Sequence, residues 1–174
     1  MEALSANYPK QALLPASGSS FKILKDEHGF RVRGIHFSSY QEVQCFIYLR
    51  FLGLKDAEIG YEYPVGRRRV DFFPRGKVFW EHHPCHLGRS EDLFQYGKRR
   101  RLMLNQEGYG DIPLVVSDVI FNDPWEVSNY MLDHGVDFLN GRVPEGRSLL
   151  YVRGYENNAK MNEEPDELTL IPKV

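Results

Sequence analysis

The segment KVFWEHHP places one carboxylate and two imidazoles directly after a run of aromatic and β-branched residues that is typical of a buried strand. Side chains alternate along a strand, so Glu81 and His83 share one face while His82 shares the other face with Trp80. A carboxylate beside an imidazole can bind a metal ion or transfer a proton near neutral pH. His82, which shares its face with a large aromatic side chain, fits a packed and hydrogen-bonded histidine instead.

A second carboxylate lies on the preceding strand-like run, at Asp71. A short turn at residues 74–76 would fold the two strands antiparallel and bring Asp71 beside Glu81. Two ionised carboxylates a few ångströms apart repel each other, and a hard cation such as Mg²⁺ between them makes the arrangement favourable. Glu42, on a predicted helix, offers a third carboxylate, although its place three residues after Ser39 equally suits a helix-capping role.

The sequence HHPCH allows a different metal. The potential zinc ligands within it are His82, His83, Cys85 and His86. A structural zinc site needs about four converging ligands, and the usual paired arms are missing elsewhere in the sequence, where Cys45 lies inside an apolar helical pattern. A zinc-stabilised interaction domain therefore stays an alternative for these residues.

Basic residues cluster on both sides of the acidic set. The candidates for binding nucleic-acid phosphates are Arg67, Arg68, Arg69, Lys98, Arg99 and Arg101. The first cluster immediately precedes Asp71, and the second follows Glu81 on the next predicted helix, so both can flank one acidic pocket. The alternative is a solvated surface that pairs with nearby acids. The formal net charge of −2 does not decide between them, because an acidic C-terminal stretch offsets the basic clusters.

Hydrophobic periodicity and turn residues predict the elements that position these side chains. The pattern predicts a hairpin (21–37), a helix (38–54), three strands (58–65, 68–74 and 77–83), a second helix (90–110), an apolar strand (112–121), a third helix (123–135) and a last strand (148–156). We expect an α/β fold with a mixed central β-sheet flanked by helices. The residues outside it are predicted to form an N-terminal arm (1–20) and an acidic C-terminal tail (156–174).

Length and composition set the class of protein. The chain of 174 residues, 42% of them hydrophobic, is long enough for one core and too short for two full domains. Its 2 cysteines are too few for a secreted disulfide framework, and the sequence has neither a recognisable signal peptide nor a long apolar span. We therefore expect a protein of a reducing compartment, cytoplasmic or nucleoid-associated, with no membrane partner.

Taken together, these features resemble the PD-(D/E)XK nuclease superfamily. The shared pattern is a helix glutamate, then Asp-Phe, a turn, Glu-x-His on the next strand, a basic helix and an apolar strand, over residues 35–119. VDFFPRGKVFWEHHP and the YGKRRRLM helix look most like phage junction-resolving endonucleases. The strand-end histidines are closer to very-short-patch mismatch-repair nucleases and their homing-endonuclease relatives. The resemblance implies a nuclease domain with a restriction-endonuclease-like core over residues 21–155.

The resemblance also implies a role for each site residue. Asp71 and Glu81 would bind Mg²⁺, for which Mn²⁺ can substitute, and the main-chain carbonyl of His82 would be a further ligand. Glu42 would hold a second ion or a water molecule. His83 would stand where the family has a lysine that activates water and steadies negative charge on the phosphate.

Two departures from the family pattern matter. The proline that usually precedes the first acid is Val70 here, at a position that only shapes the entry into the strand. An imidazole in place of the lysine can accept a proton near neutral pH but is a weaker fixed cation. We therefore expect Lys98 or Arg99 to supply any missing positive charge.

The sequence thus favours a Mg²⁺-dependent endonuclease that acts on DNA. One active site cuts one strand, so cutting both strands needs a homodimer or two binding events. The main alternative is a non-catalytic nucleic-acid-binding module with the same fold, for which the histidine-for-lysine change would be the reason. These residues do not define the DNA substrate, because junction, mismatch, homing and restriction endonucleases share this core.

Overall fold

The structure of the protein is a computed structural model that describes residues 21–83 and 90–153. Within these residues the fold is mixed α/β, with helices α1 to α4 and three small sheets. The elements are β1 (Ile23–Asp26), β2 (Gly29–Val32), β3 (Ile35–Phe37), α1 (Tyr40–Phe51), α2 (Asp56–Ile59), β4 (Tyr63–Val65), β5 (Arg68–Val70), a 3₁₀ turn η1 (Pro74–Gly76), β6 (Phe79–His82), α3 (Ser90–Gln106), β7 (Leu114–Ser117), α4 (Pro124–Asp133) and β8 (Leu150–Val152). The predicted N-terminal arm and acidic tail lie outside the described residues.

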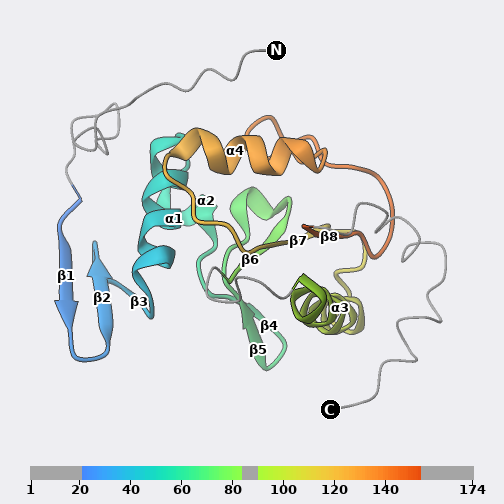
Figure 1. Ribbon diagram of the computed structural model, residues 1–174, viewed down its shortest axis with the longest axis horizontal. Helices are drawn as coiled ribbons and strands as arrows, with labels where there is room; N and C mark the ends of the chain where they lie inside the picture. The colour runs from blue at the N-terminus through green and yellow to red at the C-terminus, as the bar shows by residue number, and fades with distance from the viewer. Residues whose placement is uncertain (1–20, 84–89, 154–174) are drawn as a thin grey trace.

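The parallel sheet β6-β7-β8 forms the centre of the fold (Figure 1). Its middle strand, β7, is the predicted apolar run, and every residue in it is buried because helices cover both faces. Long α3 connects β6 to β7 and lies on one side of this sheet, while α4 connects β7 to β8 and lies on the other (Figure 1). The predicted order of elements is thus confirmed, except that the short helix α2, which the sequence did not predict, lies between α1 and the first of the three strands.

Alternation along β6 divides the core into two apolar clusters. Trp80 and Val115 face α1 and α4, whereas Phe79 and Val116 face α3. The α3 side is closely packed, since a Cβ added at Gly97 would lie 3.1 Å from carbon atoms of β8 side chains. The face of β6 that carries the predicted site is therefore the face under α3.

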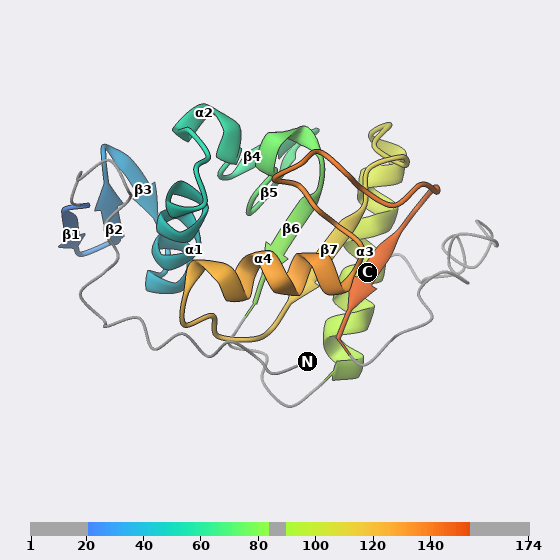
Figure 2. The same cartoon turned by 90° about the horizontal axis from the view of Figure 1, so that it is seen from above.

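An antiparallel sheet, β1-β2-β3, lies at the far side of α1 from the parallel sheet (Figure 2). The predicted hairpin forms its first two strands, and β3 extends it. Gly29 makes the turn possible: its φ is 140°, and a Cβ there would lie 2.2 Å from the carbonyl oxygen of Phe37. This sheet supports α1 through Phe37, whose ring packs against Phe46 with centroids 5.2 Å apart.

Side-chain caps fix where α1 and α4 begin, as the sequence predicted. Ser39 accepts a hydrogen bond from the main-chain N–H of Glu42 at 3.2 Å, and Asp123 accepts one from Glu126 at 2.9 Å. Both glutamate carboxylates accept a hydrogen bond from the N–H of the residue just before the cap, so two hydrogen bonds stabilise the start of each helix.

The helices flank a central sheet as predicted, but this sheet is parallel and not mixed, and β4 and β5 form a separate two-stranded sheet. After Asp71 the chain makes one antiparallel bridge to β6, between Phe72 and Trp80, and then turns away. The N–H of Phe73 bonds the carbonyls of Ile59 and Gly60, both at 3.1 Å, instead of extending the ladder. The first two residues of the predicted strand 58–65 belong to the end of helix α2 instead.

Candidate metal centre

Backbone pairing brings Asp71 beside Glu81. Phe72 and Trp80, the neighbours of the two acids, exchange main-chain hydrogen bonds of 3.0 and 2.9 Å. One residue further along, the N–H of His82 donates to Asp71 Oδ2 at 2.8 Å. The antiparallel arrangement that the sequence predicted for these two acids is therefore confirmed, through one bridge and one side-chain contact. The predicted metal ligation by the carbonyl of His82 stays a prediction.

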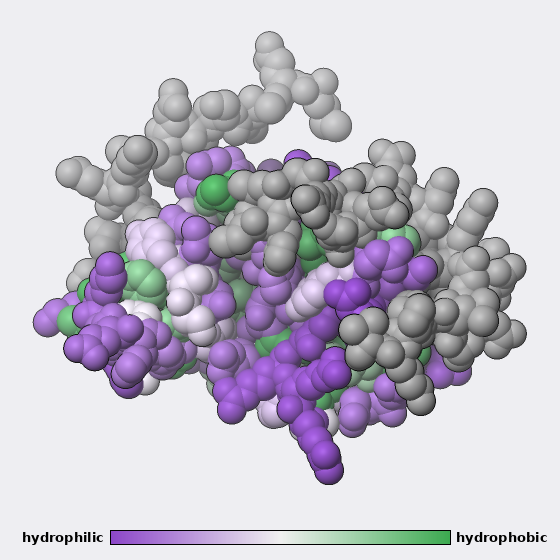
Figure 3. Space-filling model, turned by 60° about the horizontal axis from the view of Figure 1, so that its bottom comes forward, coloured by the Kyte–Doolittle hydropathy of each residue, from purple (hydrophilic) through white to green (hydrophobic). Residues whose placement is uncertain are grey.

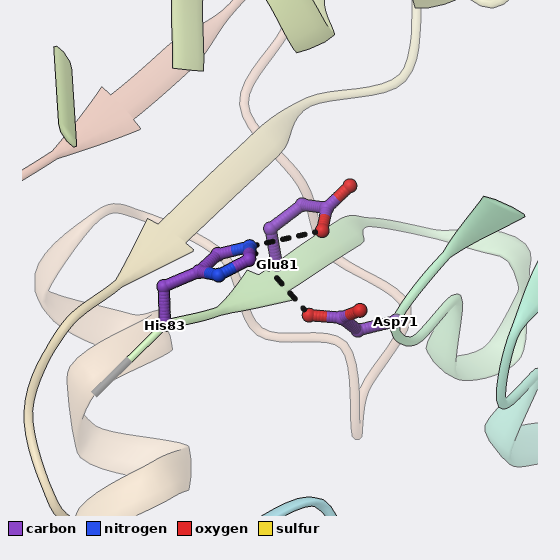
Figure 4. A group of neighbouring side chains, drawn as sticks. All are labelled: Asp71, Glu81 and His83. Atoms are coloured by element: carbon purple, nitrogen blue, oxygen red, sulfur yellow. Dashed lines mark ion pairs between the residues drawn. The ribbon is translucent and has the colours of Figure 1, made fainter. Parts of the chain in front are cut away.

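Asp71, Glu81 and His83 point toward one another (Figure 4). The His83 Nε2 atom lies 3.5 Å from Glu81 Oε2 and 4.0 Å from Asp71 Oδ2. One ligand atom from each residue lies within 4.8 Å of the other two. Two ligands of a small divalent ion, each about 2.1 Å from it, are at most about 4.2 Å apart, so a slight contraction would let the two carboxylate oxygens bind one ion with His83 Nε2 beside it. Two carboxylates suit a hard divalent cation, and an imidazole beside them can bind the ion or, if it stays unbound, accept a proton.

The electrostatics of the metal-free group agree with this interpretation. Burial, followed by repulsion from Glu81, raises the pKa of Asp71 to about 7. Burial alone would lower the pKa of His83, but its contact with Glu81 and the charges of both acids outweigh burial and raise that pKa. Without a metal ion the group therefore retains protons near neutral pH, and a bound cation would replace them.

Helix α3 supplies two further contacts that the sequence did not assign. The Tyr96 hydroxyl donates to Glu81 Oε2 at 3.1 Å and lies 2.9 Å from His83 Nε2. The Arg100 guanidinium donates from Nε to the other oxygen, Glu81 Oε1, at 2.5 Å, and its NH2 group also contacts that oxygen. Tyr96 and Arg100 are four residues apart and so share one face of α3. The four-residue spacing of Tyr96 and Arg100 was the sequence signal for these contacts, because it places both side chains on the face of α3 that covers β6.

The opposite face of β6 holds His82 in a different environment. Its Nδ1 atom lies 2.8 Å from the hydroxyl of Ser117, which also accepts a hydrogen bond of 2.7 Å from the indole of Trp80. Its ring stacks on Phe121 with centroids 5.5 Å apart. Burial, with the charge of His83, lowers the pKa of His82 to about 4. The prediction that His82 is a packed histidine is thus confirmed.

Glu42 does not belong to the group. Its carboxylate accepts hydrogen bonds from the Ser38 N–H at 3.0 Å and from the Tyr61 hydroxyl at 2.8 Å. These contacts fit the capping alternative and tie the start of α1 to the chain before β4. Glu42 still raises the pKa of Asp71 through space, as the weakest of several influences.

Most of the predicted phosphate-binding residues lie on the surface. Arg67, Arg68, Arg69 and Arg99 are exposed and Lys98 is half-buried. Arg69 is paired with Glu62 at 2.6 Å, and the Lys98 ammonium lies 5.5 Å from the centre of the Phe94 ring. Figure 3 brings the lower side of Figure 1 forward and shows hydrophilic residues gathered where the β4–β5 hairpin and α3 lie.

Arg101 corrects the predicted surface cluster, because its side chain is fully buried. Its guanidinium donates to the carbonyls of Tyr109, Ile112 and Leu149 and to the side chain of Asn105, at 2.5–3.0 Å. Burial lowers the pKa of Arg101 to about 10. This arginine fixes the end of α3 to the chain around β7 and β8, and it is not available to a phosphate.

An open hollow of about 550 Å³ lies between β3 and the β4–β5 hairpin. Its lining residues are Ile35, His36, Tyr61, Glu62, Pro64 and Arg69. The hollow is close to the candidate metal group along the backbone, since the N–H of Glu62 donates to the carbonyl of Asp71 at 2.9 Å.

Comparison of the chain with family models, with curated proteins and with solved structures gave no match. Within the described residues, no helix is both long enough and apolar enough to cross a membrane. Cys85 and His86, which the zinc alternative requires, lie outside the described residues. The geometry of the Asp71, Glu81 and His83 group therefore carries the functional argument.

Proposed function

We propose that the protein is a divalent-metal-dependent endonuclease that hydrolyses phosphodiester bonds of DNA, with Mg²⁺ or Mn²⁺ as its ion. The observation that carries the proposal is the convergence of Asp71, Glu81 and His83, two carboxylates and an imidazole within 4.8 Å of one another. Two carboxylates this close repel each other unless a proton or a cation lies between them, and a pKa of about 7 at Asp71 is typical of a functional group rather than a surface acid.

Each residue has a distinct role in this proposal. Asp71 and Glu81 hold the ion through Oδ2 and Oε2. When bound, a divalent ion lowers the pKa of a water molecule and neutralises charge on the phosphate. The single proton of the Tyr96 hydroxyl goes to Glu81, so the hydroxyl oxygen accepts from His83 Nε2 while that nitrogen is protonated. Loss of this proton leaves a lone pair on Nε2, on the side of the carboxylates, where it can accept a proton from the attacking water.

The substrate class follows from the charges around the group. Arg67 and Arg68 are exposed on the β4–β5 hairpin, and Arg99 is exposed on α3. The hairpin leads into Asp71, and α3 holds Glu81, so both elements flank the metal group. Exposed guanidinium groups on elements that flank a cation site suit a phosphate backbone, which they would bind without reading its sequence.

Cleavage of supercoiled plasmid DNA tests the proposal. The purified protein is incubated with Mg²⁺, with Mn²⁺ or with EDTA, and nicked and linear products are measured on gels. We expect cutting with either ion and none with EDTA. Asp71→Asn should abolish cutting, whereas Glu145→Gln, which removes an exposed carboxylate far from β6 in the sequence, should cut normally.

Two results would contradict the proposal. DNA binding and ion binding without any cleavage would instead support the non-catalytic module. Normal cutting by Asp71→Asn would separate the activity from this group. A panel of duplex, nicked, branched and single-stranded DNA, assayed with the active protein, would then identify the preferred substrate.

A further inference from the structure

The two oxygens of the Glu81 carboxylate have different partners. Oε1 contacts the guanidinium of Arg100 through both Nε and NH2. Oε2 faces the metal group, 3.5 Å from His83 Nε2 and 3.1 Å from the Tyr96 hydroxyl. The Glu81 side chain is only 2% exposed, so these partners take the place of water around the carboxylate. Oε2 therefore faces the proposed metal site, and Oε1 is held by the guanidinium of Arg100.

Arg100 is itself held in place. Its NH2 group also donates to the main-chain carbonyl of Arg69 at the centre of β5, and its side chain is 12% exposed. The guanidinium therefore connects α3 both to Glu81 and to the β4–β5 hairpin. A planar group that donates to two acceptors keeps its orientation better than one in a single ion pair between flexible chains.

The number of oxygens that Glu81 can offer matters to the choice of ion. Ca²⁺ takes about 6–8 oxygen ligands, often from both oxygens of one carboxylate. Mg²⁺ requires near-octahedral geometry with about six ligands, and Mn²⁺ also suits octahedral oxygen sites. A carboxylate that gives one oxygen satisfies the smaller coordination number and leaves Ca²⁺ short of a ligand.

We propose that Arg100 is a metal-selectivity residue: by occupying Glu81 Oε1 it restricts Glu81 to one oxygen and favours Mn²⁺ and Mg²⁺ over Ca²⁺. The inference rests on the metal site of the proposed function and adds to it a positioning residue. Arg100 acts through Glu81 and does not contact the ion.

The ratio of two affinities separates this role from simpler ones. Removing a positive charge near the site strengthens the binding of any divalent ion, by a similar factor for ions of equal charge. Losing a purely structural contact weakens the binding of both ions together. Freeing Glu81 Oε1 favours Ca²⁺ in particular, so only the proposed role changes the ratio of the Ca²⁺ and Mn²⁺ affinities.

Titration calorimetry of the full chain with Mn²⁺ and with Ca²⁺ gives this ratio. We expect the wild type to prefer Mn²⁺ and Arg100→Gln to move the ratio toward Ca²⁺ by about tenfold or more, the effect of one added ligand oxygen. Arg100→Lys, which retains a cation that can bind Oε1, should move it less. Arg99→Gln is the matched control, because it removes the same charge from the adjacent exposed position and should leave the ratio unchanged.

Each outcome decides the inference. A ratio that stays within twofold of the wild type in folded Arg100→Gln, with folding verified by its thermal unfolding, would overturn it. A wild type that binds neither ion would overturn both the metal site and this inference. A wild type that binds Mn²⁺ but does not cut plasmid would overturn the nuclease proposal alone, and the affinity ratio would still test Arg100.

Discussion

His82 and His83 are adjacent in the chain, yet the pleat at the end of β6 sends them to opposite faces. His82 is 6% exposed, stacks on Phe121 and bonds Ser117 beneath the apolar helices α1 and α4. The side chain of His83 is 26% exposed and lies beside two acids under α3. The pKa of the first falls to about 4, while that of the second rises. The same side chain is thus a neutral core residue on one face and a proton-binding site residue on the other.

The difference shows where this strand tolerates charge. The α1 and α4 side offers His82 one hydroxyl and aromatic rings, so a neutral imidazole is the stable form. The α3 side offers Glu81 the hydroxyl of Tyr96 and the guanidinium of Arg100 as hydrogen-bond donors, which suit a carboxylate. The helix that covers each face therefore decides which chemistry the face supports.

The largest expected effect is the loss of metal binding on the α3 face. Glu81→Gln should weaken Mn²⁺ binding by about 100-fold or more, because an amide oxygen is a poorer ligand for a hard cation than a carboxylate. His82→Phe, on the other face, should leave Mn²⁺ affinity within about twofold. Calorimetric titration of both variants measures the contrast, and equal losses in the two variants would remove the distinction between the faces.

The two faces should also give stability opposite dependences on pH. The folded-state pKa of Asp71 is raised from 3.8 to about 7, so without metal the free energy of unfolding falls as pH rises through that range. The pKa of His82 is lowered from 6.5 to about 4, so the stabilisation that comes from burying the neutral imidazole is lost as pH falls through that range. For His82 the loss is about 3 kcal/mol at most.

The two pH ranges overlap between about pH 4 and 6.5, where the two effects oppose each other, so urea unfolding of single variants in EDTA separates them. We expect the free energy of unfolding of Asp71→Asn to fall as pH is lowered through this range, because the His82 effect is no longer offset by Asp71. That of His82→Phe should fall as pH is raised through the same range and on to about 7, because the Asp71 effect is no longer offset by His82. Adding Mn²⁺ to His82→Phe should abolish this fall, because a bound cation replaces the proton. Parallel pH profiles for the two variants would contradict the assigned surroundings.

A smaller effect distinguishes packing from chemistry. His82→Ala should lower the free energy of unfolding by about 1–3 kcal/mol, because it removes a buried ring and a hydrogen bond to Ser117. His83→Ala should have little effect on stability but should weaken cutting and its dependence on pH. Urea unfolding and plasmid cleavage measure the two properties, and an inactive but stable His82→Ala would exchange the roles of the histidines.

The smallest effect concerns the arginines that flank the α3 face. Arg68→Glu should weaken DNA binding and reduce the slope of log affinity against log salt by about one unit per lost phosphate contact. Arg101→Met, in contrast, should destabilise the fold and leave this slope unchanged, because Arg101 is buried. Fluorescence anisotropy with a labelled duplex at several salt concentrations gives both slopes. An unchanged slope in Arg68→Glu would assign the hairpin to a merely solvated surface.

Local rules were enough to predict much of the site. Alternation along a strand placed Glu81 with His83 and separated them from His82, because the period of a strand does not depend on distant residues. The short turn at residues 74–76 placed Asp71 beside Glu81, because a turn is also set by residues close together in the sequence. The caps at Ser39 and Asp123 likewise depend on residues within one helical turn.

The remaining features depend on contacts between distant segments. Arg99, Arg100 and Arg101 are consecutive basic residues, and only the packing of α3 determines that they are respectively exposed, bonded to Glu81 and buried among carbonyls. The β4–β5 sheet stays separate from the parallel sheet because the N–H of Phe73 donates to the carbonyls of Ile59 and Gly60 and not to β6. Nothing in the local sequence around Glu42 predicted that Tyr61 would bond its carboxylate.

The bridge between Phe72 and Trp80 has a mechanical consequence. Asp71 follows the last strand of one sheet, and Glu81 belongs to another. Within the described residues the main-chain pairing between these sheets is that one bridge, with the contact from the His82 N–H to Asp71 beside it. An ion held by both acids would therefore crosslink the two sheets. If the β4–β5 hairpin tilted on binding a DNA backbone, the distance between Asp71 and Glu81, the two ligands of the ion, would therefore change.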